Sequence, residues 1–151
     1  MQDEPQVPRV AGSNASDILP FMVQYQASCG GNQIDEFRVA RCACGSEAFF
    51  LSYNEGGAAR RYCEECDTEH FICDSADYWD DEWDDDEVIC WDCRECRHPQ
   101  CNVGGGFALS RDREFIRWLY VGQRCVQCGL LDFCVSWKIM YGPSLQLMDQ
   151  V

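Results

Sequence analysis

The sequence predicts a small, mostly β fold that is stabilised by metal and built from two similar modules in tandem, with little helix. Three observations lead to this prediction. The chain includes 13 cysteines, several times the usual share, so disulfides or metal thiolates must contribute to folding. Leu, Ile, Val and Phe together make up only about a fifth of the chain, a level at which a packed core becomes doubtful. Finally, the cysteines fall in pairs at recurring distances.

The N-terminal sequence favours metal over disulfides. It begins MQDEPQVPRV, with no basic region followed by an apolar one, and no apolar stretch long enough to cross a bilayer occurs in the chain. We therefore expect neither a secretion signal nor a membrane span, and we expect a cytoplasmic protein. An odd number of cysteines in a reducing compartment is typical of metal thiolates.

Charge is unevenly distributed along the chain. The net charge is −14, and residues 1–87 hold 20 acids against 5 arginines, whereas residues 88–151 hold 6 acids against 7 basic residues. Such an acidic chain is not attracted to phosphate backbones or anionic lipid, so direct binding to nucleic acid or to a membrane is not expected.

Composition divides the chain into five segments. Residues 1–34, with three prolines and one short apolar patch, predict a flexible arm with one helical turn or a docking strand. The first module covers 35–75, an acidic aromatic linker 76–87, and the second module 88–139. Residues 140–151 predict a tail, either a short helix or an extended segment over apolar surface.

Alternating apolar residues predict the strands of both modules. In the first, a strand begins at Glu36, and strands over 48–53 and through 61–62 flank a turn at 54–57. In the second, strands are expected over 103–109, 115–121 and 131–139. Each module is thus one cysteine pair, a hairpin, a second cysteine pair and one more strand.

An internal repeat links the modules. Cys63, Cys66 and Phe71 correspond to Cys125, Cys128 and Phe133, and each of the three lies the same number of residues before its counterpart. The pair Cys42 and Cys44 likewise corresponds to Cys93 and Cys96. Fewer residues separate these counterparts, because the extra residues of the longer second hairpin come only after Cys96.

The cysteine pairs have the spacing of metal ligands, since C-x2-C across a tight turn places two sulfurs on one ion and a second such turn completes a tetrahedron. This layout resembles the zinc-ribbon fold group, over roughly residues 36–75 and 88–137. The resemblance implies two Zn²⁺ ions. The first pair departs from it in being C-x-C, and Asp67 and Arg97 stand where glycine commonly follows a pair. The predicted ligands are Cys42, Cys44, Cys63 and Cys66 for one ion and Cys93, Cys96, Cys125 and Cys128 for the other.

A different use of the cysteines stays open. The run Cys90, Cys93, Cys96 and Cys101 is similar to that of bacterial ferredoxins, which hold an iron–sulfur cluster, although it has one residue too many before the last cysteine. It would leave Cys125 and Cys128 without partners. In the repeat, Cys90, Cys101 and Cys134 fall at apolar positions, so we expect these three in the core.

No catalytic arrangement emerges from the sequence. A site with four thiolates is closed to substrate, and the two histidines, His70 and His98, do not occupy metal positions of the repeat. We therefore expect a protein that is not an enzyme.

The segment 74–87 carries the functional prediction. It holds nine acids in fourteen residues, together with three aromatic residues that would gain from contact with a partner. One interpretation is a docking peptide for a basic protein surface; the other is a segment that folds back onto the arginines of the second module. The predicted contact residues are Tyr78, Trp79, Trp83, Asp84, Asp85 and Asp86.

These observations predict a non-catalytic, zinc-binding protein-interaction module. The resemblance to zinc ribbons implies a regulator that contacts transcription or RNA-processing machinery. Two alternatives remain: an iron–sulfur redox protein, and an acidic mimic of nucleic acid that occupies a DNA-binding groove.

Overall fold

The computed structural model describes residues 9–29 and 31–151. Within them, eight antiparallel strands form one sheet in the order β4-β3-β2-β6-β7-β8, with β1 paired to β6 and β5 paired to β2. The strands are β1 (Glu36–Val39), β2 (Phe49–Asn54), β3 (Ala58–Cys63), β4 (Thr68–Phe71), β5 (Ile89–Cys90), β6 (Gln100–Leu109), β7 (Ile116–Cys125) and β8 (Leu131–Tyr141). The helices are α1 (Ile18–Cys29) and the short 3₁₀ segments η1 (Ala15–Asp17), η2 (Ser75–Asp77) and η3 (Leu145–Gln150). The predicted fold class, a small and mostly β protein with little helix, is confirmed.

The two halves of the sheet have the same pairing register. Ser52 lies opposite Arg60, and the residues at the equivalent positions of the repeat, Gly104 and Gly122, also lie opposite each other. The correspondence continues on the next strand pair. Arg60 lies opposite Phe71 on β3 and β4, and the equivalent residues Gly122 and Phe133 lie opposite each other on β7 and β8. The meander β2-β3-β4 therefore matches the meander β6-β7-β8 residue by residue.

The first strand of each half crosses to the other half. Val39 of β1 pairs with Gly104 of β6, and Cys90 of β5 pairs with Ser52 of β2. At the centre, Phe49 lies opposite Cys101, which is its own counterpart in the repeat. The two halves are thus joined through three strand pairings in one continuous sheet.

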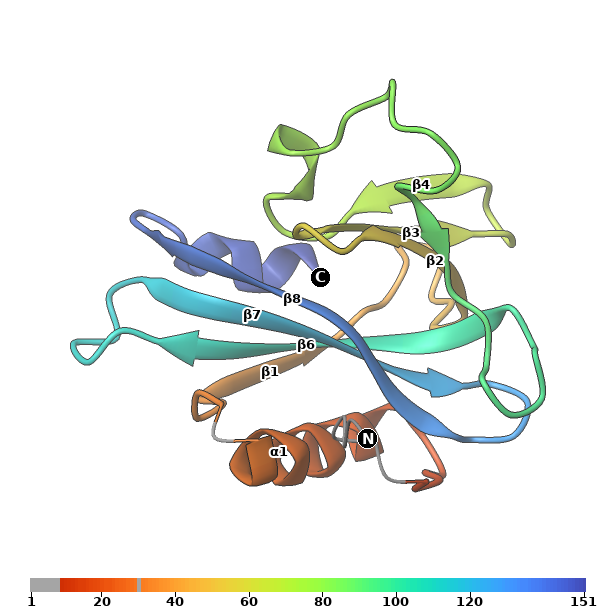
Figure 1. Ribbon diagram of the computed structural model, residues 1–151. Helices are drawn as coiled ribbons and strands as arrows, with labels where there is room; N and C mark the ends of the chain where they lie inside the picture. Colours follow the sequence, from red (N-terminus) through yellow and green to blue (C-terminus); the bar gives the residue numbers. More distant parts are fainter. Residues whose placement is uncertain (1–8, 30) are drawn as a thin grey trace, which may run out of the picture.

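The sheet is bent so that its two halves face each other across the main core. Figure 1 shows β2, β3 and β4 above β6, β7 and β8, with α1 below. The core between the halves is filled by residues from both, among them the fully buried Phe49, Leu51, Val103 and Leu119. The predicted tail contributes to it: Leu145, Leu147 and Met148 of η3 pack against this core.

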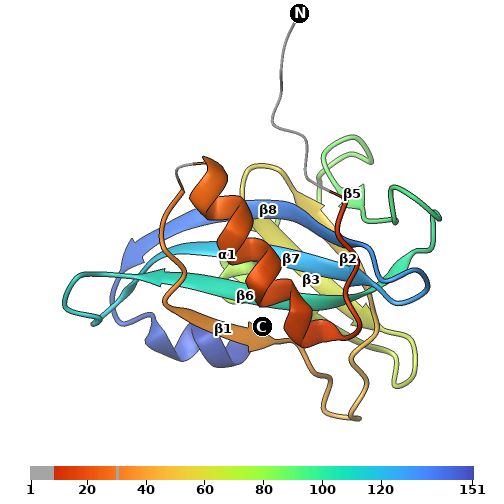
Figure 2. The ribbon, with the colours of Figure 1, turned by 90° about the horizontal axis from the view of Figure 1, so that it is seen from below.

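Helix α1 is longer than the single turn expected in the N-terminal segment. Asn14 begins the helical segment by accepting a hydrogen bond from the backbone N–H of Ser16. Ile18 and Met22 are fully buried, and Figure 2 shows α1 lying across β6, β7 and β8. The part of the predicted arm that precedes residue 9 lies outside the described residues. No helix among the described residues is long and apolar enough to span a bilayer.

One acid of the acidic segment belongs to the core. Asp74 is 4% exposed and accepts hydrogen bonds from the indole N–H of Trp137, at 2.9 Å, and the hydroxyl of Tyr141, at 3.0 Å. These hydrogen bonds connect the segment after β4 in the first half to β8 in the second half. Asp74 is therefore a structural residue. The sequence did not indicate this role, because Asp74 begins a run of acidic residues.

Replacing Asp74 by asparagine should lower the free energy of unfolding by about 1.5 kcal/mol, because one of its oxygens becomes an amide that cannot accept a hydrogen bond. Urea unfolding followed by tryptophan fluorescence measures this. Asp77→Asn is the matched control, since Asp77 is exposed at the end of the short helix η2, which begins directly after Asp74. Equal midpoints for the two variants would contradict the structural role.

Candidate metal centres

The first group of sulfurs lies at one end of the half that contains β2-β3-β4. Cys42 and Cys44 come from the loop between β1 and β2, Cys63 ends β3, and Cys66 lies in the turn before β4. All four sulfurs lie within 4.8 Å of one another. The sulfurs of Cys42 and Cys66 are 3.2 Å apart, and those of Cys44 and Cys63 are 3.6 Å apart.

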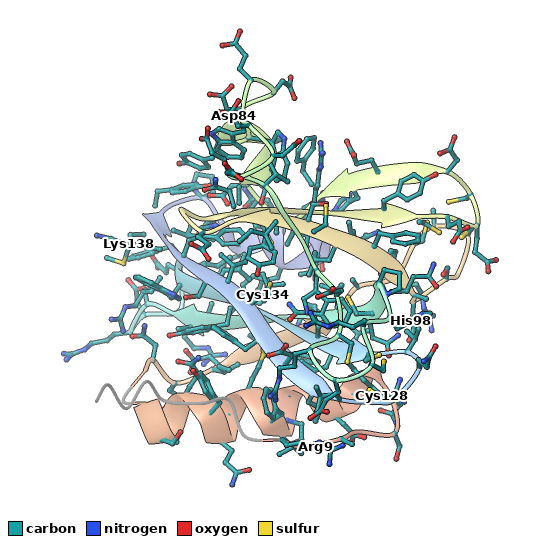
Figure 3. The ribbon with its side chains drawn as sticks, turned by 45° about the vertical axis from the view of Figure 1, so that its right-hand side comes forward. Arg9, Asp84, His98, Cys128, Cys134 and Lys138 are labelled. Atoms are coloured by element: carbon teal, nitrogen blue, oxygen red, sulfur yellow. The ribbon has the colours of Figure 1, made fainter. Side chains whose placement is uncertain are left out.

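The second group has the same construction. Cys93 and Cys96 come from the loop between β5 and β6, Cys125 ends β7, and Cys128 lies in the turn before β8. The distances between the sulfurs of Cys93 and Cys128, and of Cys96 and Cys125, are both 3.5 Å. In Figure 3 the labelled Cys128 lies near His98 and Arg9, at the edge of the molecule.

The two groups have the dimensions of a tetrahedral metal site. Zinc–sulfur bonds of about 2.3 Å place the sulfurs of a tetrahedron about 3.8 Å apart, so only small shifts would be needed to close each group on one ion. In both groups the cysteine that ends a strand, Cys63 or Cys125, is fully buried, and the second cysteine of the turn that follows, Cys66 or Cys128, is exposed. Each group could therefore hold a metal ion.

The surroundings favour thiolate in one cysteine of each group. The backbone N–H of Cys44, followed by the Cys66 thiol, lowers the pKa of Cys42 to about 7. Burial opposes ionisation of Cys93, but the backbone N–H groups of Cys96 and Glu95, together with the thiols of Cys128 and Cys96, outweigh it and lower its pKa to about 7. Backbone dipoles thus point at the sulfurs, as metal thiolates require.

All four cysteine turns end in a residue with positive φ. These are Gly45 (95°), Asp67 (55°), Arg97 (64°) and Gly129 (79°), each directly after the second cysteine of its pair. Asp67 and Arg97 thus adopt the left-handed conformation that glycine adopts without strain. Asp67 is held there by a hydrogen bond from the hydroxyl of Tyr62. The missing glycines therefore leave the form of the turns unchanged.

Replacing Arg97 by glycine should stabilise the protein by about 1 kcal/mol, because it removes the strain of a side chain in the left-handed region. The ion pair that Arg97 loses, with Asp92 at 3.7 Å, is exposed and weak. A higher melting temperature at unchanged metal content is the expected result. A lower melting temperature would show that the arginine supports the turn.

The ferredoxin-like set of cysteines is not gathered in the structure. Cys93 and Cys96 lie with Cys125 and Cys128, while Cys90 and Cys101 belong to neither group. Cys101 is fully buried, as expected, and burial raises the pKa of its thiol well above the usual value. Cys134 is half-buried against the core, whereas Cys90 is exposed, so its predicted core position is wrong. Its strand β5 is very short and lies at the surface.

The histidines lie outside both groups. The Nε2 atom of His70 is 2.8 Å from the carbonyl oxygen of Gln150, and burial lowers its pKa. The carbonyl of His98 accepts a hydrogen bond from the backbone N–H of Cys93, so this residue shapes the turn through its backbone.

The acidic segment folds back, but onto the first half and not onto the arginines of the second. Trp79 lies under the guanidinium of Arg60, at 4.3 Å, and its ring is 5.7 Å from that of Phe71. The ring of Trp83 meets the ring of Trp79 edge-on at 5.2 Å. Tyr78 remains 57% exposed, away from the core.

The carboxylates beyond Trp79 are not compensated. Residues 80–87, which we call the acidic loop, contain seven acids around Trp83, and Figure 3 shows Asp84 at the far tip of the molecule. None of the ion pairs found among residues 9–29 and 31–151 involves these acids, which include the predicted contact residues Asp84, Asp85 and Asp86. A dense negative charge is therefore presented to solvent.

Comparison with known proteins identified no relative of this chain. A scan against models of protein families, a search of curated proteins and a search of solved structures each found no match to this chain. The candidate sites therefore stand on their own geometry.

Proposed function

We propose that the protein is a non-catalytic interaction module, folded around two zinc ions, that binds a protein with a basic surface through its acidic loop. The observation that carries the proposal is the uncompensated charge of this loop beside two tryptophans. Like charges held together are costly for the folded protein, and an oppositely charged partner would relieve the repulsion and speed association. The resemblance to zinc ribbons suggests a partner in the transcription or RNA-processing machinery.

The tryptophans make the loop suitable for docking. Trp79 is bound to Arg60 and Phe71 of the sheet, so it fixes one end of the loop in place. Trp83 packs on Trp79 and remains partly exposed, which makes its apolar surface accessible to a partner. The loop thus combines long-range attraction with a preformed apolar contact.

Zinc is the ion we propose for both groups, because four closed thiolates and a reducing compartment suit a structural zinc site. Iron is the alternative, since four thiolates also hold iron or an iron–sulfur cluster. In either case the same eight cysteines are the ligands.

The docking proposal is tested by replacing Asp84, Asp85 and Asp86 together by asparagine. Immobilised protein should capture partners from the native cell at low salt, and the triple variant should capture far less, because association depends on charge. Raising the salt concentration from about 0.05 to 0.5 M should mimic the variant. Partners retained equally by the variant would contradict the proposal.

The same capture separates the nucleic-acid mimic from other docking proteins. A mimic occupies a DNA-binding groove, so DNA would displace the captured partner from the immobilised protein. Partners that bind DNA and this protein together would instead indicate an adaptor.

A further inference from the structure

The outer face of β2 and β3 carries a groove that the acidic loop covers only in part. Its volume is about 410 Å³, and it lies between the sheet, the acidic loop and β5. Its lining includes Ser52, Arg60, Trp79, Trp83, Val88 and Cys90. Four aspartates of the segment 80–85 complete the lining.

The floor of this groove has a counterpart in the other half of the sheet. Ser52 and Arg60 are opposite each other on β2 and β3, and their counterparts Gly104 and Gly122 are opposite each other on β6 and β7. Phe71, beside Arg60 on β4, corresponds to Phe133 on β8. The groove therefore lies where the second half has the floor beneath α1.

Helix α1 shows how that floor is filled in the second half. A Cβ atom on Gly122 would come within 2.8 Å of Met22, so the helix rests directly on this glycine. One on Gly104 would come within 2.6 Å of the ring of Phe37 and 3.2 Å of Ile18, so β1 and the helix cover that glycine together. Farther along, the ring of Tyr25 lies 5.5 Å from that of Phe133. The apolar face of a helix is thus what this arrangement of strands accommodates.

In the first half Trp79 covers part of the same floor. Its ring contacts the counterparts of Gly122 and Phe133, namely Arg60 and Phe71. The charge of Arg60 is already engaged by Trp79 and by Glu69, at 3.5 Å. What remains open is the groove between Trp83, Val88 and the aspartates.

We propose that this groove binds a basic amphipathic helix of the partner protein, on the same outer face of the sheet as α1 and beside the position equivalent to that of α1. This inference rests on the proposed function, since it specifies the partner's structure. One or two helical turns would insert apolar side chains beside Trp83 and Val88. Lysines or arginines on the flanking positions would face the aspartates.

The test uses the full chain and two displayed peptide libraries. In the first, peptides of about four helical turns vary at every position of a helix-forming framework. In the second, the same framework carries a central proline, which breaks the helix. We expect enrichment from the first library only, of peptides with apolar residues at i, i+3 or i+4 and i+7 and basic residues beside them.

The groove is then blocked by Ser52→Trp, which fills its floor without changing the acidic loop. Enriched peptides should bind this variant at least tenfold more weakly. Val23→Trp is the matched control, because Val23 is an exposed residue of α1, on the opposite side of the molecule from the groove. Metal content verifies that both variants fold.

A second measurement uses the unaltered protein, so it does not depend on the folding of a variant. Peptide added to ¹⁵N-labelled protein should shift the indole N–H signals of Trp79 and Trp83 and the amide signals of Ser52 and Cys90. Shifts confined to the acidic loop would overturn the helix groove.

The outcomes distinguish the inference from the proposed function. Basic peptides enriched equally from both libraries would be consistent with a loop that docks basic partners, but they would refute the proposal that the partner binds as a helix. No enrichment of helical peptides from either library would also refute it. Enriched peptides without basic residues, or binding insensitive to Asp84, Asp85 and Asp86, would refute the docking function as well.

Discussion

Replacing Cys63 by serine is expected to reduce the metal content from two ions per chain to one and to destabilise the first half of the sheet strongly. Structural zinc contributes on the order of 10 kcal/mol to the folding of small domains, which is comparable to the whole stability of an ordinary domain. Cys63 is fully buried at the end of β3, and its sulfur is 3.6 Å from that of Cys44. A serine hydroxyl there is a poor zinc ligand, so the remaining thiols would be left without their ion.

The loss should spread beyond the first half. Strand β1, which leads to Cys42 and Cys44, pairs with β6 of the second half, and β5 of the second half pairs with β2. We therefore expect one broad thermal transition at a lower temperature, and not the loss of one independent module. Cys128→Ser should have the mirrored effect.

Cys73→Ser is the matched control. Its sulfur donates a hydrogen bond to the carbonyl of Leu147, at 3.1 Å, which a hydroxyl can replace, and Cys73 belongs to neither sulfur group. This variant should retain two ions. Elemental analysis gives the metal count, and the absorption spectrum gives its identity, because zinc thiolates are colourless and iron thiolates absorb visible light. Two ions retained in Cys63→Ser would refute the ligand assignment.

The strands and the two cysteine groups could be predicted because both depend on local sequence. Alternation of apolar residues defines a strand, and the spacing of Cys63 and Cys66 within one turn defines half a metal site. The internal repeat then paired each turn with its partner. This is why all eight predicted ligands, from Cys42 to Cys128, lie in the two sulfur groups.

The parts that sequence could not predict depend on contacts between distant segments. Helix α1 is stabilised by the glycine floor of β6 and β7, which only folding brings beneath Ile18 and Met22. The crossing of β1 and β5 between halves leaves no local signal. Asp74 looks like its acidic neighbours until the donors on Trp137 and Tyr141 come into reach.

Replacing Trp83 by alanine is expected to weaken binding of the partner by about 2 kcal/mol or more, chiefly through faster dissociation. Trp83 borders the groove of the acidic loop and retains exposed surface, so it is positioned as the apolar centre of the contact. Inside the protein, the ring of Trp83 packs edge-on against the ring of Trp79. The variant should therefore lose only a little of its own stability, which thermal melting measures alongside dissociation of captured partners.

Trp79→Ala provides the comparison that separates docking from folding. Trp79 contacts Arg60 and Phe71 and holds the loop to the sheet, so its loss should lower the melting temperature clearly. Binding would also weaken, because a loop released from the sheet must be ordered again when the partner binds. If instead Trp83→Ala lowered the melting temperature as much as Trp79→Ala and left dissociation unchanged, both tryptophans would serve the fold alone. The acidic loop would then be a cover for the sheet, and the partner would have to bind elsewhere.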